Sequence, residues 1–523
     1  MRIVAIITGK LFLLSSSDVS IDNSNLEVTD ENRERHRVLL LKDLNINATN
    51  FLINGPDVSA RINSLAFIDS RGVEVTNMKT NFLYTLQNMT FNDLTISTPK
   101  SSLSGNLRFD YQREDLQYFE DKVKVTADFK NSKVALNELN TFYNEFGANQ
   151  IVTLNTSLSG TLNNLNATNL RLRNSSKTII NGDINFKNLF NSEDDNFVMD
   201  GDFKNLSSNY YDLRALLPNI LGEAIPSSFE RLGDFKIVGK SIVTSKDIKA
   251  DIDIETDLGY IVSDMELTKI DNIDNASYKG NIVFDEFDLG TFLEDPMLGT
   301  TSFNLDVDGY GFTLENLNTQ VKGEVYGLNY NNYDYKLTNV SGNLKNKVFN
   351  GEITSDDTNL KLDFNGLVDY SNTNENIYDF TANVEHADLR ALQFVTRDSL
   401  SVFKGNVTMN MKGKTIDDVY GTIAFNNTLY ENENDSYYFK DFSIESQFKG
   451  TVREIDINSP EIIEGRLRGK FNFRDVQKLV ENSVGSIYTN YNPHLLEPNQ
   501  FIDYNFEFFS CNSCNFLYNF SIK

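Results

Sequence analysis

Five residues of the chain belong to types that hold metal ions or transfer electrons and protons, two cysteines and three histidines. Cys511 and Cys514 form a Cys-x-x-Cys pair, a spacing that serves in other proteins as a redox centre or as half of a zinc site. A zinc site needs a second pair of ligands, and no histidine stands at a suitable spacing. The histidines are His36, His386 and His494. The pair therefore predicts neither chemistry. Residues 509–523 break the preceding pattern, and we expect this aberrant tail to pack poorly.

Two further motifs have the residue types of a ligand site but not the full pattern. Asp251-Ile-Asp-Ile-Glu255 spaces its carboxylates as the start of a calcium loop does, yet Thr256 stands where that loop needs glycine. The same alternation is typical of a strand with one solvated face. Gly309-Tyr-Gly311 lacks the third glycine of a dinucleotide-binding loop and opens no helix. The sequence thus predicts a protein that is not an enzyme and has no metal or cofactor.

The composition limits the classes of partner. The chain has 523 residues, and 74 acidic against 48 basic residues give a formal net charge of -26. Binding to nucleic acid or to an anionic membrane surface requires clustered cations, so both are disfavoured. A hydrophobic content of 40% is too high for a disordered chain. With only 8 prolines and no Gly/Ser-rich linkers, we expect one continuous architecture.

The N-terminal residues 1–14 leave two interpretations open. They include an apolar stretch that is too short to span a bilayer and is interrupted by Gly9 and Lys10. Arg2 before that stretch is typical of a targeting peptide, but no small-x-small cleavage site precedes Asp18. A strand pair is favoured over a targeting remnant. No other window is apolar enough to span, so we expect any membrane anchor to lie outside this chain.

The elements that organise the chain are clearest in residues 377–429. Apolar and polar residues alternate in three runs there, and a short amphipathic piece at 387–394 separates the first two. Alternation predicts strands with one apolar face, in the order strand, one or two helical turns, strand, turn, strand. Looser copies start roughly 75 to 100 residues apart, which indicates an extended array. The repeats cover 123–190, 197–270, 278–370 and 377–475.

The fold class predicted from these patterns is all-β. We expect a long twisted antiparallel sheet, curled into an elongated groove of repeating units, with a few short helices as covers. Those helices are expected at 136–146, 211–217, 288–293 and 475–480. Residues 1–115 show a meander without helix signals, so a soft boundary is placed near residue 115. Hairpin turns are expected at Asn181-Gly182, Asn350-Gly351 and Asn365-Gly366, because both residues of each pair tolerate positive φ.

The apolar strand faces must be covered, either by a second sheet or by the same sheet curling into a trough for an apolar ligand. Acyl chains suit such a trough because they need area rather than directional bonds. Alternation predicts that Asp251, Asp253 and Arg171 point away from it. The candidate residues lining a lipid groove are Leu170, Leu172, Ile252, Ile254, Val407, Met409, Met411, Ile423 and Phe425.

Several stretches resemble the TamB translocation and assembly module proteins of the Bacteroidetes type. They are Tyr210-Tyr-Asp-Leu-Arg-Ala-Leu-Leu-Pro218, Asn272-Ile-Asp-Asn-Ala-Ser-Tyr-Lys-Gly-Asn281, Ala387-Asp-Leu-Arg-Ala-Leu392 and Leu479-Val-Glu-Asn-Ser-Val-Gly-Ser-Ile-Tyr-Thr-Asn-Tyr-Asn-Pro493. The similarity extends over about residues 15–507 and carries no catalytic residue. It implies an AsmA-like meander over 1–115 and TamB-type groove repeats over 116–508. Family members are longer, and we expect their inner-membrane anchor and C-terminal domain to lie outside this sequence.

The resemblance implies a role in the bacterial cell envelope. Such proteins face the periplasm and are implicated in outer-membrane protein assembly or secretion, and in phospholipid transport between the two membranes. The implied partners are phospholipid acyl chains and an outer-membrane assembly partner of the Omp85 type. A second hypothesis is a structural or adhesive surface array without a lipid ligand. Dry stacked sheets would favour the array, and an open trough with an apolar floor would favour the conduit.

Overall fold

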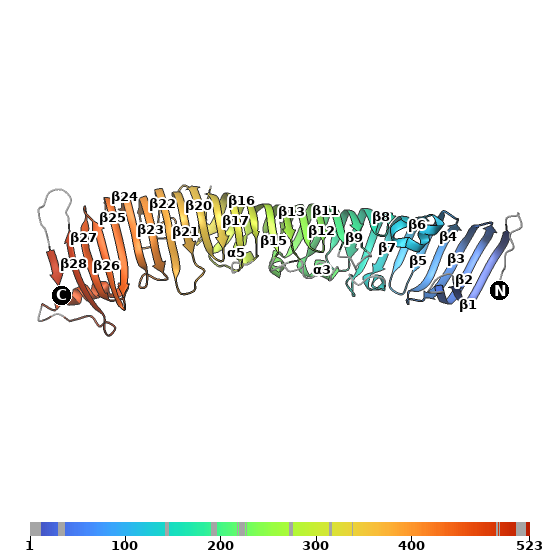
Figure 1. Cartoon of the computed structure of the whole chain (residues 1–523), viewed down its shortest axis with the longest axis horizontal. Coiled ribbons are helices and arrows are strands. Elements are labelled where there is room, and N and C mark those ends of the chain that lie inside the picture. The colour runs from blue at the N-terminus through green and yellow to red at the C-terminus, as the bar shows by residue number, and fades with distance from the viewer. Residues whose placement is uncertain are drawn as a thin grey trace. The chain divides into compact units, whose positions relative to one another are not determined.

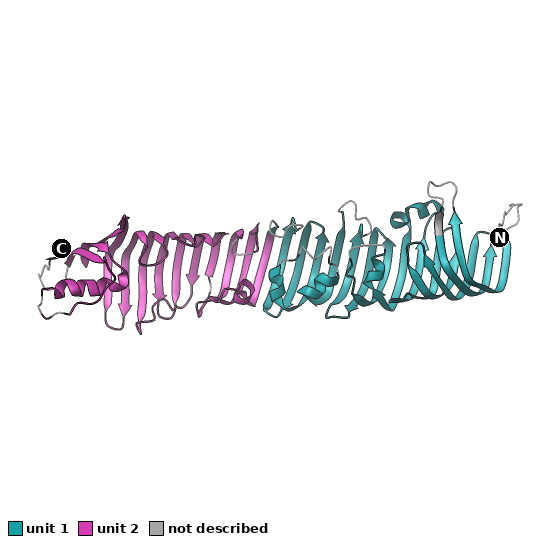
Figure 2. Cartoon of the chain, turned by 90° about the horizontal axis from the view of Figure 1, so that it is seen from below, with its two compact units in different colours: residues 1–278 teal, residues 279–523 magenta. Residues whose placement is uncertain are grey.

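A computed structural model describes most of the chain. The residues described are 12–29, 37–141, 146–189, 196–216, 218, 225, 227–270, 276–312, 316–336, 338–487, 490, 492–508 and 519–522. Cys511, Cys514, His36 and residues 1–11 of the N-terminal stretch 1–14, for which a strand pair is favoured, therefore lie outside the described residues. The chain divides into two compact units, residues 1–278 and residues 279–523, which Figure 2 shows in different colours.

The structure confirms the all-β fold class. Strands account for 67% of the chain, the sheet is open and antiparallel, and the helices are few and short. In unit 1 each strand pairs with the next along the chain, in the sequence order of Figure 1. These strands are β1 (Leu13–Thr29), β2 (Arg37–Asn54), β3 (Asp57–Asp69), β4 (Glu74–Tyr84), β5 (Asn88–Ser97), β6 (Ser102–Asp110), β7 (Lys124–Ala135), β8 (Ile151–Thr161), β9 (Asn164–Asn174), β10 (Ile179–Lys187), β11 (Val198–Asn209), β12 (Asp234–Thr244), β13 (Asp247–Thr256) and β14 (Gly259–Thr268). Strand β15 (Ser277–Asp288) contains the boundary between the units.

Unit 2 has the same meander. Its strands pair in chain order from β16 onward, and the short β18 pairs with the end of β17 beside β19. The strands are β16 (Leu298–Tyr310), β17 (Asn318–Tyr330), β18 (Tyr333–Tyr335), β19 (Thr338–Lys345), β20 (Val348–Asp356), β21 (Leu360–Asp369), β22 (Asn376–Asp388), β23 (Ser401–Gly413), β24 (Tyr420–Asn432), β25 (Ser436–Lys449), β26 (Val452–Ser459), β27 (Ile463–Lys470), β28 (Phe501–Phe508) and β29 (Asn519–Ile522).

The helices are short excursions between strands. In unit 1 they are η1 (Arg113–Tyr118), α1 (Phe119–Lys122), α2 (Leu136–Leu139), α3 (Tyr210–Leu216) and η2 (Ser227–Leu232), and in unit 2 they are α5 (Leu289–Leu293), η4 (Phe473–Asp475) and α6 (Val476–Gly485). The predictions for 211–217, 288–293 and 475–480 are confirmed by α3, α5 and α6. The predicted helix 136–146 is too long: α2 ends at Leu139, Asn140 and Thr141 form a turn, and residues 142–145 lie outside the described part. The amphipathic piece at 387–394 forms a single helical turn, closed by the Leu392 amide donating to the Asp388 carbonyl at 2.9 Å.

The strand–helix–strand–strand order predicted for the repeats occurs four times. It is formed by β7-α2-β8-β9, by β11-α3-β12-β13, by β15-α5-β16-β17, and by β22, the turn at Leu392, β23 and β24. The predicted boundary near residue 115 falls in η1, between β6 and β7, and these two strands are paired with each other.

The three Asn-Gly turn predictions are wrong. Asn181-Gly182 lies within β10, Asn350-Gly351 within β20 and Asn365-Gly366 within β21. The glycines are there because they meet neighbouring backbone closely: a Cβ on Gly366 would lie 2.4 Å from the Asp379 carbonyl oxygen. Gly342, Gly351 and Gly366 pair with one another across β19, β20 and β21, so three strands approach closely at one level.

Bulges in unit 1 explain much of the asparagine content. Asn23, Asp93, Asn131 and Asn169 have φ between 45° and 52° in the middle of strands, a region that Asn and Asp tolerate. A side chain on the neighbouring strand accepts a hydrogen bond from each of these backbone amides. The acceptors are Asn45 at 2.9 Å, Asn106 at 3.0 Å, Asn155 at 2.6 Å and Asp183 at 2.6 Å. Bulges bend a strand and increase its twist, so this repeated device curves the sheet.

Candidate functional site

The apolar face of unit 2 is built from rows of directly paired residues. Cross-strand partners point to the same face of a sheet, so a chain of partners traces one row. One row passes through Val340, Ile353, Phe364, Ala382, Val407, Phe425 and Phe442. The row beside it passes through Gly366, Phe380, Met409, Ile423, Ile444 and Ile457. Phenyl rings in the first row lie in contact, with centroids of Phe425 and Phe442 6.1 Å apart.

The apolar face of unit 1 has the same construction. One row passes through Leu154, Leu172, Ile180, Leu206, Ile237, Ile254 and Ile261. A second passes through Leu170, Gly182, Phe203, Gly239 and Ile252. Two glycines thus flank Phe203 in this row, and a third, Gly201, leaves room for its ring, because a Cβ there would lie 2.6 Å from the Phe203 Cζ.

Each unit therefore brings its predicted lining residues onto one face. In unit 1, Leu172 and Ile254 lie in the first row and Leu170 and Ile252 in the second. In unit 2, Val407 pairs with Phe425 and Met409 with Ile423, while Met411 is the neighbouring partner of Gly421. All nine are buried or half-buried. The charged residues predicted to face away, Asp251, Asp253 and Arg171, are exposed.

Parts of this face are covered by the excursions between strands. In unit 1, Leu216 of α3 and Leu136 of α2 belong to a cluster that contacts Leu154, Leu172 and Ile180. In unit 2, Leu392 belongs to a buried cluster against which Phe364, Phe380 and Val407 pack. Leu479 and its neighbours on α6 cover Ile455, Ile457 and Leu467. In the described part of unit 2, α5 lies against β16 and α6 against the C-terminal strands, as Figure 1 shows. The residues Met409, Ile423, Phe425 and Phe442 between these covers are half-buried, so part of each side chain stays exposed, and we call them the open floor.

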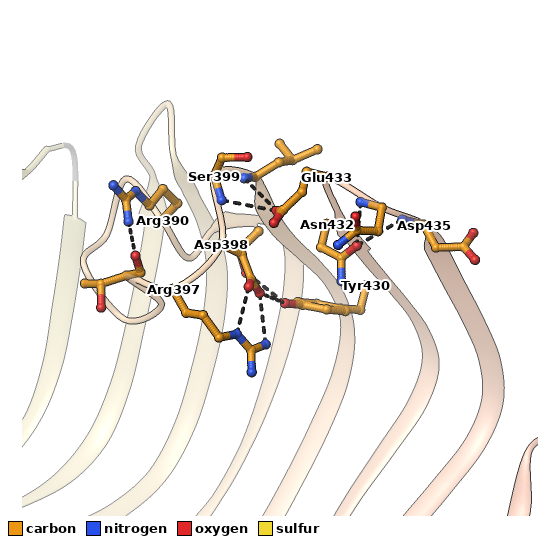
Figure 3. A network of polar contacts seen from close by, with 12 residues as sticks. Arg390, Arg397, Asp398, Ser399, Tyr430, Asn432, Glu433 and Asp435 are labelled. Atoms are coloured by element: carbon orange, nitrogen blue, oxygen red, sulfur yellow. Dashed lines mark hydrogen bonds and ion pairs between the residues drawn. The ribbon is translucent and has the colours of Figure 1, made fainter.

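Polar networks border the open floor at the ends of the strands. At one long rim the Asp398 carboxylate accepts hydrogen bonds from the Arg397 guanidinium, at 2.8 and 3.1 Å, and from the Tyr430 hydroxyl at 3.2 Å (Figure 3). The Arg397 guanidinium holds the pKa of Asp398 below its usual value, and the Tyr430 hydroxyl adds to this effect. At the other rim, the backbone amides of Lys414 and Thr415 donate to Asp418 at 2.9 and 2.6 Å. The four side chains of the open floor are uncharged, so the interaction that they offer is burial of apolar surface.

Comparison of the chain with family models, with curated proteins and with solved structures finds no match. Over the described residues, no three His, Cys, Asp or Glu side chains are placed to hold a metal ion. Within that same part of the chain, no helix has both the length and the apolar character needed to cross a membrane.

A hollow of about 860 Å³ lies on the opposite, polar face of unit 1, and it differs from the apolar floor. Its lining includes one row of directly paired residues, Thr90, Arg108, Thr126 and Ser159. These side chains are hydroxyls and an arginine that is already paired with Asp110 at 2.6 Å. The rest of the lining is mixed, because Leu83, Leu107 and Leu158 stand among further Asn, Thr and Asp side chains.

Sequence reasoning missed several members of the floor. Phe380 and Phe442 belong to the same rows as the predicted residues and were identifiable from the alternation of their own strands. The residues at the ends of the rows were harder to predict from the sequence. Tyr430 follows a bulge at Asn427, with φ 49°, which reverses the alternation predicted for β24. A pattern of period two cannot locate the inner face beyond such a residue.

Proposed function

We propose that this chain is a non-enzymatic component of a bacterial cell envelope and binds phospholipid acyl chains along its apolar face. The observation that carries the proposal is the row of paired apolar residues in each unit, which in unit 2 stays partly exposed at the open floor. A continuous apolar surface of this kind implies a ligand or a partner, whereas scattered exposed leucines do not. The resemblance to TamB supplies the setting: a periplasm-facing conduit that takes part in outer-membrane protein assembly and lipid transport.

The partners follow from the same proposal. Acyl chains are the ligand, and an Omp85-type outer-membrane protein is the implied assembly partner. An inner-membrane anchor would belong to the longer protein of this family. A structural or adhesive array, the alternative, requires the apolar face to be dry and filled by protein. The side chains of the open floor are only partly buried, and this favours the conduit over that alternative.

Ile423→Asp tests the proposal directly. Ile423 lies in the open floor between Met409 and Ile444, so the new carboxylate would stand in the acyl path. In a water-accessible trough this carboxylate stays hydrated, and we expect folding to be retained while co-purified phospholipid is lost. In a dry core an unpaired charge would unfold the protein. Thermal unfolding and mass spectrometry of extracted lipid measure the two effects.

Thr408→Asp is the matched control. Thr408 is exposed on the polar face of β23, next to Met409 in sequence, and its partners Thr381 and Ala424 are uncharged. The same charge placed there should leave both folding and bound lipid unchanged. Loss of folding in Ile423→Asp, together with wild-type protein that never carries lipid, would overturn the conduit and support the array.

A further inference from the structure

Tyrosines in the described part of unit 2 gather near strand ends, whereas phenylalanines lie both near the ends, as Phe349 and Phe403 do, and in the middle of strands. Phe364, Phe380, Phe425 and Phe442 lie in the middle of strands of 10 to 14 residues. The tyrosines lie mainly at strand ends. Among the described residues, those at or within three residues of an end are Tyr310, Tyr330, Tyr333, Tyr335, Tyr370, Tyr378, Tyr420, Tyr430, Tyr437, Tyr438 and Tyr504. An apolar ring with a polar tip favours a boundary between apolar and aqueous surroundings. Tyrosines near the strand ends that face the floor are therefore suited to such a boundary at the long rims.

Two of these tyrosines face the same side as the floor at one rim. Tyr430 pairs with Phe403 on β23 and with Tyr437 on β25, and Phe403 packs against the cluster around Leu392 on the apolar face. The rings of Tyr430 and Tyr437 stack with centroids 6.4 Å apart. The Tyr430 hydroxyl is committed to Asp398 and Ser401, so its position is fixed by the rim network of Figure 3.

Tyr437 differs from Tyr430 because its hydroxyl is available. Its side chain is 45% exposed, and no described residue forms a hydrogen bond with its hydroxyl. Its ring is held in place by the stack on Tyr430. A phenol in this position offers one donor and one acceptor just above the apolar floor.

The opposite rim has a second pair. Tyr378 lies in the row beside Phe380, paired with Met411, and the Tyr370 ring meets it edge-on at 6.0 Å. The Tyr378 hydroxyl accepts a hydrogen bond from the Asn376 side chain at 3.2 Å, while Tyr370 is 52% exposed. Gly421, which pairs with Met411, lies nine residues before Tyr430 on β24. The floor between the two tyrosine pairs therefore follows a strand for about 30 Å.

We propose that Tyr437, with Tyr370 and Tyr378 at the other rim, contacts the polar headgroup of an acylated amphiphile whose chain lies on the open floor. The inference rests on the proposed function, and it adds the position of the polar headgroup, at the rims of the trough. A wholly apolar ligand would need no polar contact at the rims. A protein surface packed dry against the floor would have to supply its own polar group opposite the Tyr437 hydroxyl. An amphiphile satisfies both the phenyl floor and the phenolic rims.

Photoreactive lipids test this placement. The purified chain is exchanged with phosphatidylcholine vesicles that contain a lipid with a diazirine either at the end of its acyl chain or in its headgroup. After irradiation, labelled peptides are identified by mass spectrometry. We expect the acyl probe to label the peptides of Met409 and Ile423, and the headgroup probe to label those of Tyr437 and Tyr370.

Tyr437→Leu supplies the matched variant, because leucine keeps an apolar side chain and removes the phenol. We expect headgroup labelling at that rim to fall about fivefold, the equilibrium factor of one ordinary hydrogen bond, while acyl labelling of the floor remains. Tyr438→Leu is the control. Tyr438 is the next residue, points to the other face and is 62% exposed, so labelling should not change.

The outcomes separate the two proposals. The rim assignment would be overturned, with the conduit unaffected, if the acyl probe labels the floor but the headgroup probe labels residues away from the rims. An equal effect of the Tyr437→Leu and Tyr438→Leu variants on headgroup labelling would have the same consequence. Absence of floor labelling by the acyl probe would overturn the proposed function and the rim assignment together. Circular dichroism of each variant verifies that the sheet is retained.

Discussion

The Arg453 guanidinium lies over the Phe473 ring, 4.6 Å from its centroid, and joins the β25–β26 hairpin to the segment that leads into α6. Arg453 is only 3% exposed. It donates to the Ser446 hydroxyl at 2.9 Å and to the carbonyl oxygens of Ile416 at 2.8 Å and Val419 at 2.5 Å. One side chain therefore connects the turn between β23 and β24, the end of β25 and the start of the α6 excursion.

Arg453→Lys should destabilise unit 2 by about 2–4 kcal/mol, because an ammonium group cannot reproduce the planar fork that reaches three acceptors. Burial lowers the pKa of Arg453, yet an arginine stays charged at neutral pH. Denaturant unfolding monitored by tyrosine fluorescence measures the change. Arg468→Lys, at an exposed position of β27, is the control and should stay close to wild type. Equal stability of the two variants would contradict the connecting role of Arg453.

Gly366→Ala should destabilise the sheet by about 2–4 kcal/mol, because a small-to-large change at a close approach forces the backbone apart. Gly366 has φ 147°, and its added Cβ would lie 2.4 Å from the Asp379 carbonyl oxygen and 2.6 Å from the Phe380 Cβ. Gly327→Ala is the control, since a Cβ there meets nothing within 4 Å. The free energy of unfolding of Gly327→Ala should stay within about 1 kcal/mol of wild type. Similar midpoints of thermal unfolding for the two variants would refute the close-approach argument.

The rim network predicts a pH dependence at Asp398. Because Arg397 and Tyr430 favour the carboxylate, the pKa of Asp398 in the folded protein lies below its ordinary value of 3.8. The unfolded chain then binds that proton more readily than the folded chain. The stabilisation is fully present above pH 3.8 and is lost as the pH falls through the lower, folded pKa.

Asp398→Asn removes this carboxylate and nearly preserves the shape of the side chain. We expect Asp398→Asn to unfold at lower denaturant concentration than wild type at pH 7, and the difference to shrink as the pH falls below 3.8. Paired denaturant titrations at pH 7 and at successive acidic values provide the measurement. A difference that stays constant across this range would show that the network stabilises through shape rather than charge.

The alternation of apolar and polar residues determined the all-β class, the order of elements in the repeats and the common face of the predicted lining residues. Val407, Met409 and Met411 face one side because strand geometry fixes the side of every second residue, whatever lies next to it. Short helices such as α6 were likewise predictable from local spacing. These properties depend on neighbours in sequence.

Only the tertiary structure decided which strands place their residues side by side and where alternation fails. Asn-Gly pairs favour turns locally, but close approach to Asp379 and Phe380 places Gly366 in the middle of a strand. The bulge at Asn427 brings Tyr430 onto the inner face, and Arg453 finds its acceptors 34 to 37 residues away along the chain for Val419 and Ile416. Such positions depend on partners that are distant in sequence, and period-two alternation carries no information about those partners.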